Sequence, residues 1–325
     1  MEGEEIAPKS NVWAWVLVGV VIVAAGLAVW YFYFRTNSSK STETEESQVV
    51  SGQVEPKEEY SAEYNWSKMS EGPYNDQVSF ATSKDLLNWT DSDQVLAIHA
   101  SVPDAIVKDG IIYTYFVDVS TDGYKEKIGL MKSSDSGKTW SQKVNATIKG
   151  LGTKTAVDPD PFLLPDGRIR LYYFDISTTK NDPHLQNNTI YSAISSDGVN
   201  FVEEEGYRLK YPAIFDSDVI KVVEGYRMYA GTNDQRVIYA DSADGLTFNY
   251  QGVSLSGGAI PNVVIKDGKY YLFTGGVEIS TSTDGKVFEK IGKRFQVLGS
   301  ITADPGVIHL ADGSYLMFYK TKVEH

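Results

Sequence analysis

From residue 64 to the C-terminus the sequence alternates between two kinds of short segment, and this alternation limits the folds that the chain can adopt. The first kind is a pair of apolar, β-branched and aromatic runs joined by Asp-Gly or Glu-Gly, a pattern that predicts a β-hairpin. Its five copies are Val102–Tyr115, Asp158–Tyr173, Asp216–Tyr229, Ile260–Phe273 and Asp304–Tyr319. Internal repeats of this length are typical of propellers and other repeat architectures.

The second kind of segment is Ser-x-Asp, followed by an aromatic residue four or five positions after the Asp. The five copies begin at Ser83, Ser133, Ser195, Ser242 and Ser282. Residues 133–140 match the Asp-box of sialidases and related propellers at every defined position. Because an Asp side chain readily bonds to its own turn, we expect this motif to build a hairpin and not a catalytic site.

The order of the two segments predicts the topology. Five inner hairpins alternating with five outer hairpins give five four-stranded blades. The first outer segment, around 78–89, has no inner hairpin before it, and the last inner hairpin, Asp304–Tyr319, has no outer segment after it. The sequence therefore predicts an all-β, five-bladed propeller over 64–325 whose last blade is completed by the N-terminal strands. A β-sandwich, the alternative, would not need one hairpin type missing at each end.

The N-terminal region predicts a membrane anchor and a tether. After a tail at 1–11, residues 12–34 carry no charge. As a helix they would span about 34 Å, which exceeds a hydrocarbon core of about 30 Å. A cleaved signal peptide would have a shorter apolar core that ends in small residues, so we expect a retained single-pass anchor. Residues 35–63 are rich in Ser, Thr and Glu, which predicts a disordered linker.

The orientation of the anchor is encoded in two conflicting ways. Lys9 precedes the span while Arg35 and Lys40 follow it, which favours a cytoplasmic propeller. Asn-x-Ser/Thr sequons and a Ser/Thr-rich stalk favour the outside of the cell. We predict a membrane protein with an extracellular propeller. The five sequons lie at Asn37, Asn65, Asn88, Asn145 and Asn187.

Charge and composition exclude several classes of function. The formal net charge is −13, and both the N-terminal region and the propeller are acidic, so we expect no nucleic-acid partner. The chain has no Cys, which excludes thiol nucleophiles and Cys–zinc sites. With only four His, a multi-His metal site is not expected. We expect a monomeric propeller.

Carboxylates gather where the five inner strands begin. In a propeller these positions converge on the central channel, so six Asp side chains from four blades would lie near one axis. Glycoside hydrolysis needs one protonated and one ionised carboxyl group, and clustered carboxylates raise one another's pKa. Two alternatives are Asp side chains that cap backbone amides, and a bound Ca²⁺. The positions are Val102 and Asp104, Asp158 and Asp160, Asp216 and Asp218, Ile260 and Asn262, and Asp304 and Gly306.

Two of the repeats resemble a known group of proteins. The segment 156–162 followed by Asp166-Gly167, and the segment 303–305 followed by Asp312-Gly313, look like repeats of the five-bladed arabinanase, levansucrase and invertase-type propellers. The resemblance covers 64–325 and implies a glycoside hydrolase-like fold. These enzymes use an Asp of the first blade as base or nucleophile, an Asp of the second to orient and tune, and a Glu or Asp of the third as acid.

Carried over to this sequence, the resemblance implies Asp158 as the tuning residue and Asp216, or else Asp218, as the acid. At the first-blade position the chain has Val102, so Asp104 would have to act as the base. The third blade reads 215-FDS-217 where arabinanase-like enzymes have Glu-Gly-Pro. Further candidates for substrate binding are Asp160, Asp218, Asn262, Asp304, His184 and Tyr211.

The leading hypothesis is therefore a membrane-anchored, glycoside hydrolase-like propeller that acts on carbohydrate through the carboxylates of the central channel. It would need no cofactor, with Ca²⁺ as the one candidate ion. The alternative is a non-catalytic propeller in which the same channel binds a glycan, a cation or a protein. Val102 favours this alternative, whereas the paired Asp residues favour the enzyme.

Overall fold

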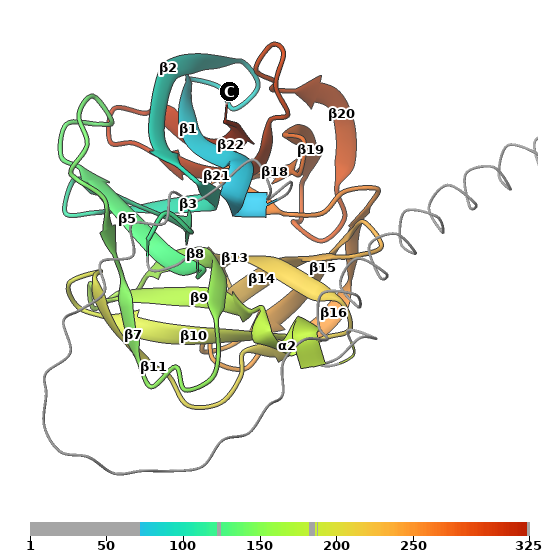
Figure 1. The fold of residues 1–325 in the computed structure, drawn as a ribbon. Helices are drawn as coiled ribbons and strands as arrows, with labels where there is room; N and C mark the ends of the chain where they lie inside the picture. The colour runs from blue at the N-terminus through green and yellow to red at the C-terminus, as the bar shows by residue number, and fades with distance from the viewer. Residues whose placement is uncertain (1–71, 122–124, 182–185, 187, 324–325) are drawn as a thin grey trace, which may run out of the picture. The chain divides into compact units, whose positions relative to one another are not determined.

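The computed structural model describes residues 72–121, 125–181, 186 and 188–323, which form a five-bladed β-propeller (Figure 1). The predicted anchor at 12–34 and the linker at 35–63 lie outside these residues. Among the residues that are described, no helix combines the length and the apolar character needed to cross a membrane.

The first and second blades follow one another along the chain, and each is an antiparallel sheet with its first strand innermost. The second blade gains β7 (Thr147–Lys149), parallel to its outermost strand, and β12 (Leu209–Lys210). The first blade consists of β3 (Ala100–Lys108), β4 (Ile111–Asp118), β5 (Lys127–Ser133) and β6 (Val144–Asn145); the second consists of β8 (Ala156–Leu163), β9 (Ile169–Asp175), β10 (Thr189–Ser195) and β11 (Asn200–Glu203), with the short helix α2 (Ser177–Asn181) after β9.

The third and fourth blades repeat this arrangement without additions. The innermost strands of successive blades contact one another in ring order and surround the central channel. The third blade consists of β13 (Ile214–Val222), β14 (Gly225–Thr232), β15 (Arg236–Ser242) and β16 (Asn249–Ser256); the fourth consists of β17 (Asn262–Lys266), β18 (Lys269–Thr274), β19 (Glu278–Ser282) and β20 (Glu289–Arg294).

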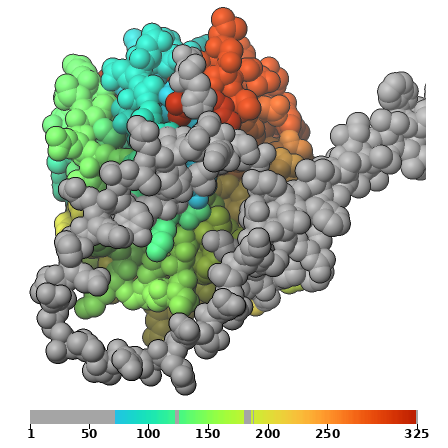
Figure 2. Space-filling view, in the orientation of Figure 1, coloured from blue at the N-terminus to red at the C-terminus, as the bar shows by residue number. Residues whose placement is uncertain are grey.

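The fifth blade is built from both ends of the propeller. Its two inner strands are β21 (Ala303–His309) and β22 (Tyr315–Lys322), and its two outer strands are β1 (Asp76–Ser83) and β2 (Trp89–Ile98), which follow the 3-10 turn η2 (Gly72–Asn75). Strand β1 pairs with β22 along all eight of its residues. In the space-filling view the cyan N-terminal strands adjoin the red C-terminal strands (Figure 2). The predicted closure of the ring is confirmed.

Three of the Ser-x-Asp turns accept a hydrogen bond from the preceding blade. Within the turn at Asp197, the carboxylate accepts the N–H groups of Val199 and Asn200, each at 2.8 Å. Between blades, the Tyr172 hydroxyl of β9 donates to the Gly245 carbonyl in the turn of the third blade at 2.9 Å. Tyr115 and Tyr229 make the equivalent bonds to Gly198 and Gly285. These turns therefore have a structural role, while their likeness to sialidase Asp-boxes stays a prediction.

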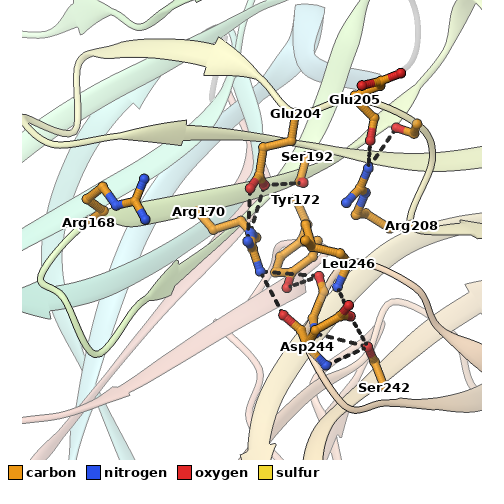
Figure 3. A network of polar contacts seen from close by, with 12 residues as sticks. Arg168, Arg170, Tyr172, Ser192, Glu204, Glu205, Arg208, Ser242, Asp244 and Leu246 are labelled. Atoms are coloured by element: carbon orange, nitrogen blue, oxygen red, sulfur yellow. Dashed lines mark hydrogen bonds and ion pairs between the residues drawn. The ribbon is translucent and has the colours of Figure 1, made fainter.

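Figure 3 shows one of these junctions, between the second and third blades. Arg170 of β9 forms a two-pronged ion pair with Glu204, at 2.7 and 2.9 Å, and also donates to the carbonyls of Asp244 and Gly245. Glu204 belongs to the same blade as Arg170, and paired guanidinium–carboxylate bonds of this kind fix geometry well. The ion pair therefore holds the guanidinium in place, and its bonds to the two carbonyls join the second blade to the third.

We expect Gly245→Ala to destabilise the propeller more than Gly268→Ala. Both glycines have a positive φ, +74° and +75°, which costs an alanine about 1 kcal/mol. A Cβ at Gly245 would also lie 2.9 Å from the Tyr172 hydroxyl, whereas nothing lies within 4 Å at Gly268. Overpacking adds about 1–3 kcal/mol. Urea unfolding of the two variants measures the difference, and equal losses would contradict the junction's role.

Candidate functional site

The five innermost strands share one backbone irregularity where they enter the channel. The equivalent residue of each blade has a positive φ. In four blades this residue lies within the inner strand, and a β-bulge shifts the register there. In the fourth blade it lies two residues before the strand begins. A bulge re-aims the side chains around it. We call these positions the first ring: Val102 (φ 49°), Asp158 (φ 53°), Asp216 (φ 42°), Ile260 (φ 56°) and Asp304 (φ 54°).

Residues two positions further along form a second ring. It consists of Asp104, Asp160, Asp218, Asn262 and Gly306. The first ring, together with Asp104 and Asn262, lines a pocket of about 20 Å³. That volume is on the scale of a single water molecule. The first ring is thus a tight acidic constriction of the channel.

One side of the first ring is neutralised by an ion-pair network. Lys320 of β22 places its Nζ 3.0 Å from the Asp304 carboxylate and 3.1 Å from that of Asp76. The Ser101 hydroxyl donates to the same two carboxylates, and Lys322 adds a second cation 2.8 Å from Asp76. Both carboxylates are almost fully buried. Because a buried charge without a partner is costly, these ion pairs and hydrogen bonds stabilise the two carboxylates.

The other side holds the pair Asp158 and Asp216. Burial raises the pKa of Asp158 to about 7 and raises the pKa of Asp216 well above its ordinary value, and the charge of Asp304 adds to both effects. A hydrogen bond between the two carboxyl groups lowers the pKa of Asp158 and raises that of Asp216. Both carboxyl groups therefore keep a proton to a higher pH than an ordinary Asp does, and their hydrogen bond favours the proton on Asp216. Two neighbouring carboxyls whose pKa values are shifted in opposite directions by their hydrogen bond can serve acid–base chemistry.

The second ring brings three carboxylates together. One oxygen from each of Asp104, Asp160 and Asp218 lies within 4.8 Å of the others. Asn262 donates its amide to Asp218 at 2.9 Å. Burial raises the pKa of all three carboxyls, to about 7 for Asp218. At Gly306 a Cβ would lie 2.7 Å from the Asp104 carboxylate, so the fifth position must be glycine.

The structure thus separates the three predicted catalytic residues into two groups. Asp104, Asp158 and Asp216 all line the first-ring pocket. Asp158 pairs with Asp216, whereas the Asp104 carboxyl lies with the second ring.

The predicted substrate-binding residues divide in a similar way. Asn262 and Asp304 line the first-ring pocket, and Asp160 and Asp218 line the channel beyond it. Tyr211 stacks on Tyr250 of β16, an outermost strand, with ring centroids 5.0 Å apart. His184 lies outside the described residues.

Lys320 and Asp76 are site residues that the sequence reasoning missed. The signal for Lys320 was present, because counting outward from the turn at Asp312-Gly313 places it opposite Asp304, although the bulge shifts its partner to Ala303. Asp76 had no such signal, since its place depends on the pairing of β1 with β22.

The unfolding free energy should fall as pH rises from 5 to 8. Asp158 and Asp218 have a pKa of about 7 in the folded protein, against about 4 in an unfolded chain. A carboxyl group whose pKa is higher in the folded than in the unfolded protein contributes to stability. This contribution is complete below the unfolded-state pKa and is lost as the pH rises through the folded-state pKa. Each group contributes a slope of at most about 1.4 kcal/mol per pH unit. Urea unfolding at several pH values tests this, and Asp158→Asn should flatten the slope. A stability that rises over this range would contradict the assignment.

Comparison with solved structures identifies the architecture. The Bombyx mori GH32 β-fructofuranosidase superposes with a TM-score of 0.55 at 20% identity, covering 67% of this chain and 54% of that enzyme. A thermostable family-43 glycoside hydrolase gives a TM-score of 0.52 at 12% identity, over 68% of this chain and 87% of the other. The fold is that of the GH32 and GH43 propellers. The resemblance expected from the repeats is confirmed.

A GH43 β-1,3-galactosidase with galactodeoxynojirimycin also superposes, with a TM-score of 0.52 at 11% identity, over 71% of this chain and 92% of the other. This chain spans about half the length of the silkworm enzyme. No protein-family model matches the chain, and no curated protein matches its sequence. At these identities the similarity shows a shared fold.

Proposed function

We propose that this protein is a membrane-anchored, glycoside hydrolase-like propeller that acts on extracellular carbohydrate through the first ring. The observation that carries the proposal is the Asp158–Asp216 pair. These two carboxyls come from neighbouring blades, both have a raised pKa, and their hydrogen bond lowers the pKa of Asp158 while raising that of Asp216. Glycosidic bond cleavage requires such a division between acid and base.

In this proposal Asp216 donates its proton to the glycosidic oxygen as the bond breaks. Asp158 orients Asp216 and tunes its pKa through their hydrogen bond. Asp104, which also borders the pocket, is the base, since Val102 supplies no carboxylate at the first-ring position of that blade. The pocket of about 20 Å³ is too small for a sugar ring, so the sugar would lie above the first ring with its scissile oxygen directed at Asp216.

Two observations favour a second candidate, a non-catalytic propeller that recognises a glycan, a cation or a protein. Two of the five first-ring positions, Val102 and Ile260, carry no carboxylate. Asp216 and Asp304 are only 8% and 2% exposed, which restricts their access to a bulky substrate. In this candidate the acidic rings hold a ligand without cleaving it.

A turnover screen separates the two candidates. The full-length chain is incubated with aryl glycosides and with plant and microbial polysaccharides, and released sugar is quantified. The enzyme proposal expects release from at least one substrate. Glycan binding without release from any member of the panel would favour the recognition propeller.

The extracellular placement can be tested with a single introduced cysteine, because the chain has none of its own. Val223 lies in a hairpin turn and is 98% exposed. We expect Val223→Cys to react with a membrane-impermeant maleimide on intact cells, and Glu5→Cys, on the other side of the anchor, to react only after lysis. The reverse pattern would place the propeller in the cytoplasm.

A further inference from the structure

The central channel widens beyond the second ring, toward the face that carries the Asp-Gly turns. A cavity of about 370 Å³ opens there, compared with about 20 Å³ at the first ring. Its lining follows the inner strands from the second ring toward their turns, as residues 104–106 and 218–221 show. Cavities of several hundred Å³ are of the size that binds small molecules.

The walls of this cavity are apolar. Side chains alternate along a strand, so the residue two positions after each second-ring residue faces the same side. In four blades these residues line the cavity: Ile106, Phe162, Ile220 and Val264. Apolar walls of this kind pack well against the hydrocarbon part of a ligand. They offer no polar partners to a metal ion that carries its hydration shell.

The inner end of the cavity is acidic, and in the part of the chain that the structure describes no cationic side chain forms an ion pair with its three carboxylates. Asp160 is 2% exposed, and its Oδ2 has no hydrogen-bond partner among the described residues. Within the same part of the chain, the ion pairs of Lys320 and Lys322 go to Asp76 and Asp304 and do not reach the second ring. Lys221, at the rim, places its ammonium 4.0 Å from the ring centroid of Tyr226. Burial and mutual repulsion raise the pKa of Asp104 and Asp160, and a bound cation would relieve both effects.

We propose that this cavity binds a small organic cation whose ammonium group donates hydrogen bonds to Asp104, Asp160 and Asp218. An ammonium has three donors, which matches three carboxylates whose oxygens lie within 4.8 Å of one another. The hydrocarbon part of the ligand lies against the four apolar side chains of the wall. The site opens on the face opposite to the proposed carbohydrate site and shares only Asp104 with the proposed catalytic residues.

Calorimetric titration of the full-length chain tests the proposal with four probes. n-Butylammonium carries both the charge and the hydrocarbon, n-butanol lacks the charge, and ammonium lacks the hydrocarbon. We expect saturable binding of n-butylammonium at least about tenfold tighter than that of n-butanol or ammonium. Ca²⁺ is the fourth probe. Ca²⁺ binding without n-butylammonium binding would overturn the proposal in favour of a metal site.

Variants locate the binding in the cavity. Asp160→Asn should weaken n-butylammonium about tenfold or more by removing one charge, and Ile220→Ser should weaken it without affecting ammonium. Asp135→Asn, in an exposed turn, is the matched control and should bind as the wild type does. Unchanged affinity in Asp160→Asn would overturn the proposal. If that variant does not fold, unchanged affinity in Ile220→Ser overturns it instead.

Discussion

Removal of residues 1–92 should abolish folding of the propeller, whereas removal of residues 1–63 should leave it folded. The longer deletion takes away all of β1, which pairs with β22 along its whole length. It also removes Val78, Phe80 and Ala81, which are buried against the neighbouring blades. The fifth blade would keep only β21 and β22, with β22 as an exposed edge. Near-ultraviolet circular dichroism and thermal unfolding of the two truncated chains provide the measurement.

A peptide that covers residues 72–98 is the control for this prediction. If the closure of the ring is the reason for the loss, the peptide added in trans should restore cooperative unfolding to the chain that lacks 1–92. Equal stability of the two truncated chains would show that β1 and β2 are dispensable and that the ring does not depend on them.

The second large effect is expected on turnover. Asp158→Asn and Asp216→Asn should each lower kcat/KM by about 10²–10⁴-fold, the range that general acid–base groups contribute. Asn keeps the shape of the side chain, so the fold should persist. Activity per folded molecule, measured on a substrate from the screen, provides the comparison.

Asp135→Asn and Asp284→Asn are the matched controls, since each makes the same chemical change in a Ser-x-Asp turn. Their carboxylates accept hydrogen bonds within the turn, from Thr139 and Lys286 respectively. We expect a modest loss of stability and unchanged activity per folded molecule. A similar loss of turnover in all four variants would mean that global destabilisation, and not site chemistry, explains the result.

The topology could be predicted from the sequence because it depends on local signals that repeat. Each Asp-Gly or Glu-Gly turn specifies a hairpin through its own backbone preferences, and five copies in alternation with Ser-x-Asp turns leave one arrangement of blades. The closure of the ring could be predicted by counting hairpins. The first blade-forming segment lacks an inner hairpin and the last lacks an outer one, so the two ends together complete one blade. None of these steps required knowledge of a side-chain contact.

The site could be predicted in outline but not in detail. The repeats predicted that six Asp residues surround the channel. The resemblance to known propellers implied that Asp104, Asp158 and Asp216 act together as one catalytic group. Asp104 lies two residues further along its strand than the first-ring position, and its carboxyl gathers with those of Asp160 and Asp218. The bulge and the positive φ at the first-ring residues are local distortions that simple alternation along a strand does not reveal. The wide cavity beyond the second ring was missed because it depends on how five strands diverge, which no single segment encodes.

The role of Asp216 as the acid is the central claim, and its most direct test compares leaving groups. Wild type and Asp216→Asn are assayed on a series of aryl glycosides whose phenols span a wide range of pKa. A glycoside with a good leaving group needs no proton from the enzyme, so the account predicts that the variant's deficit grows steadily with the pKa of the phenol. A deficit that is the same for every leaving group, or an absence of turnover by the wild type, would contradict it.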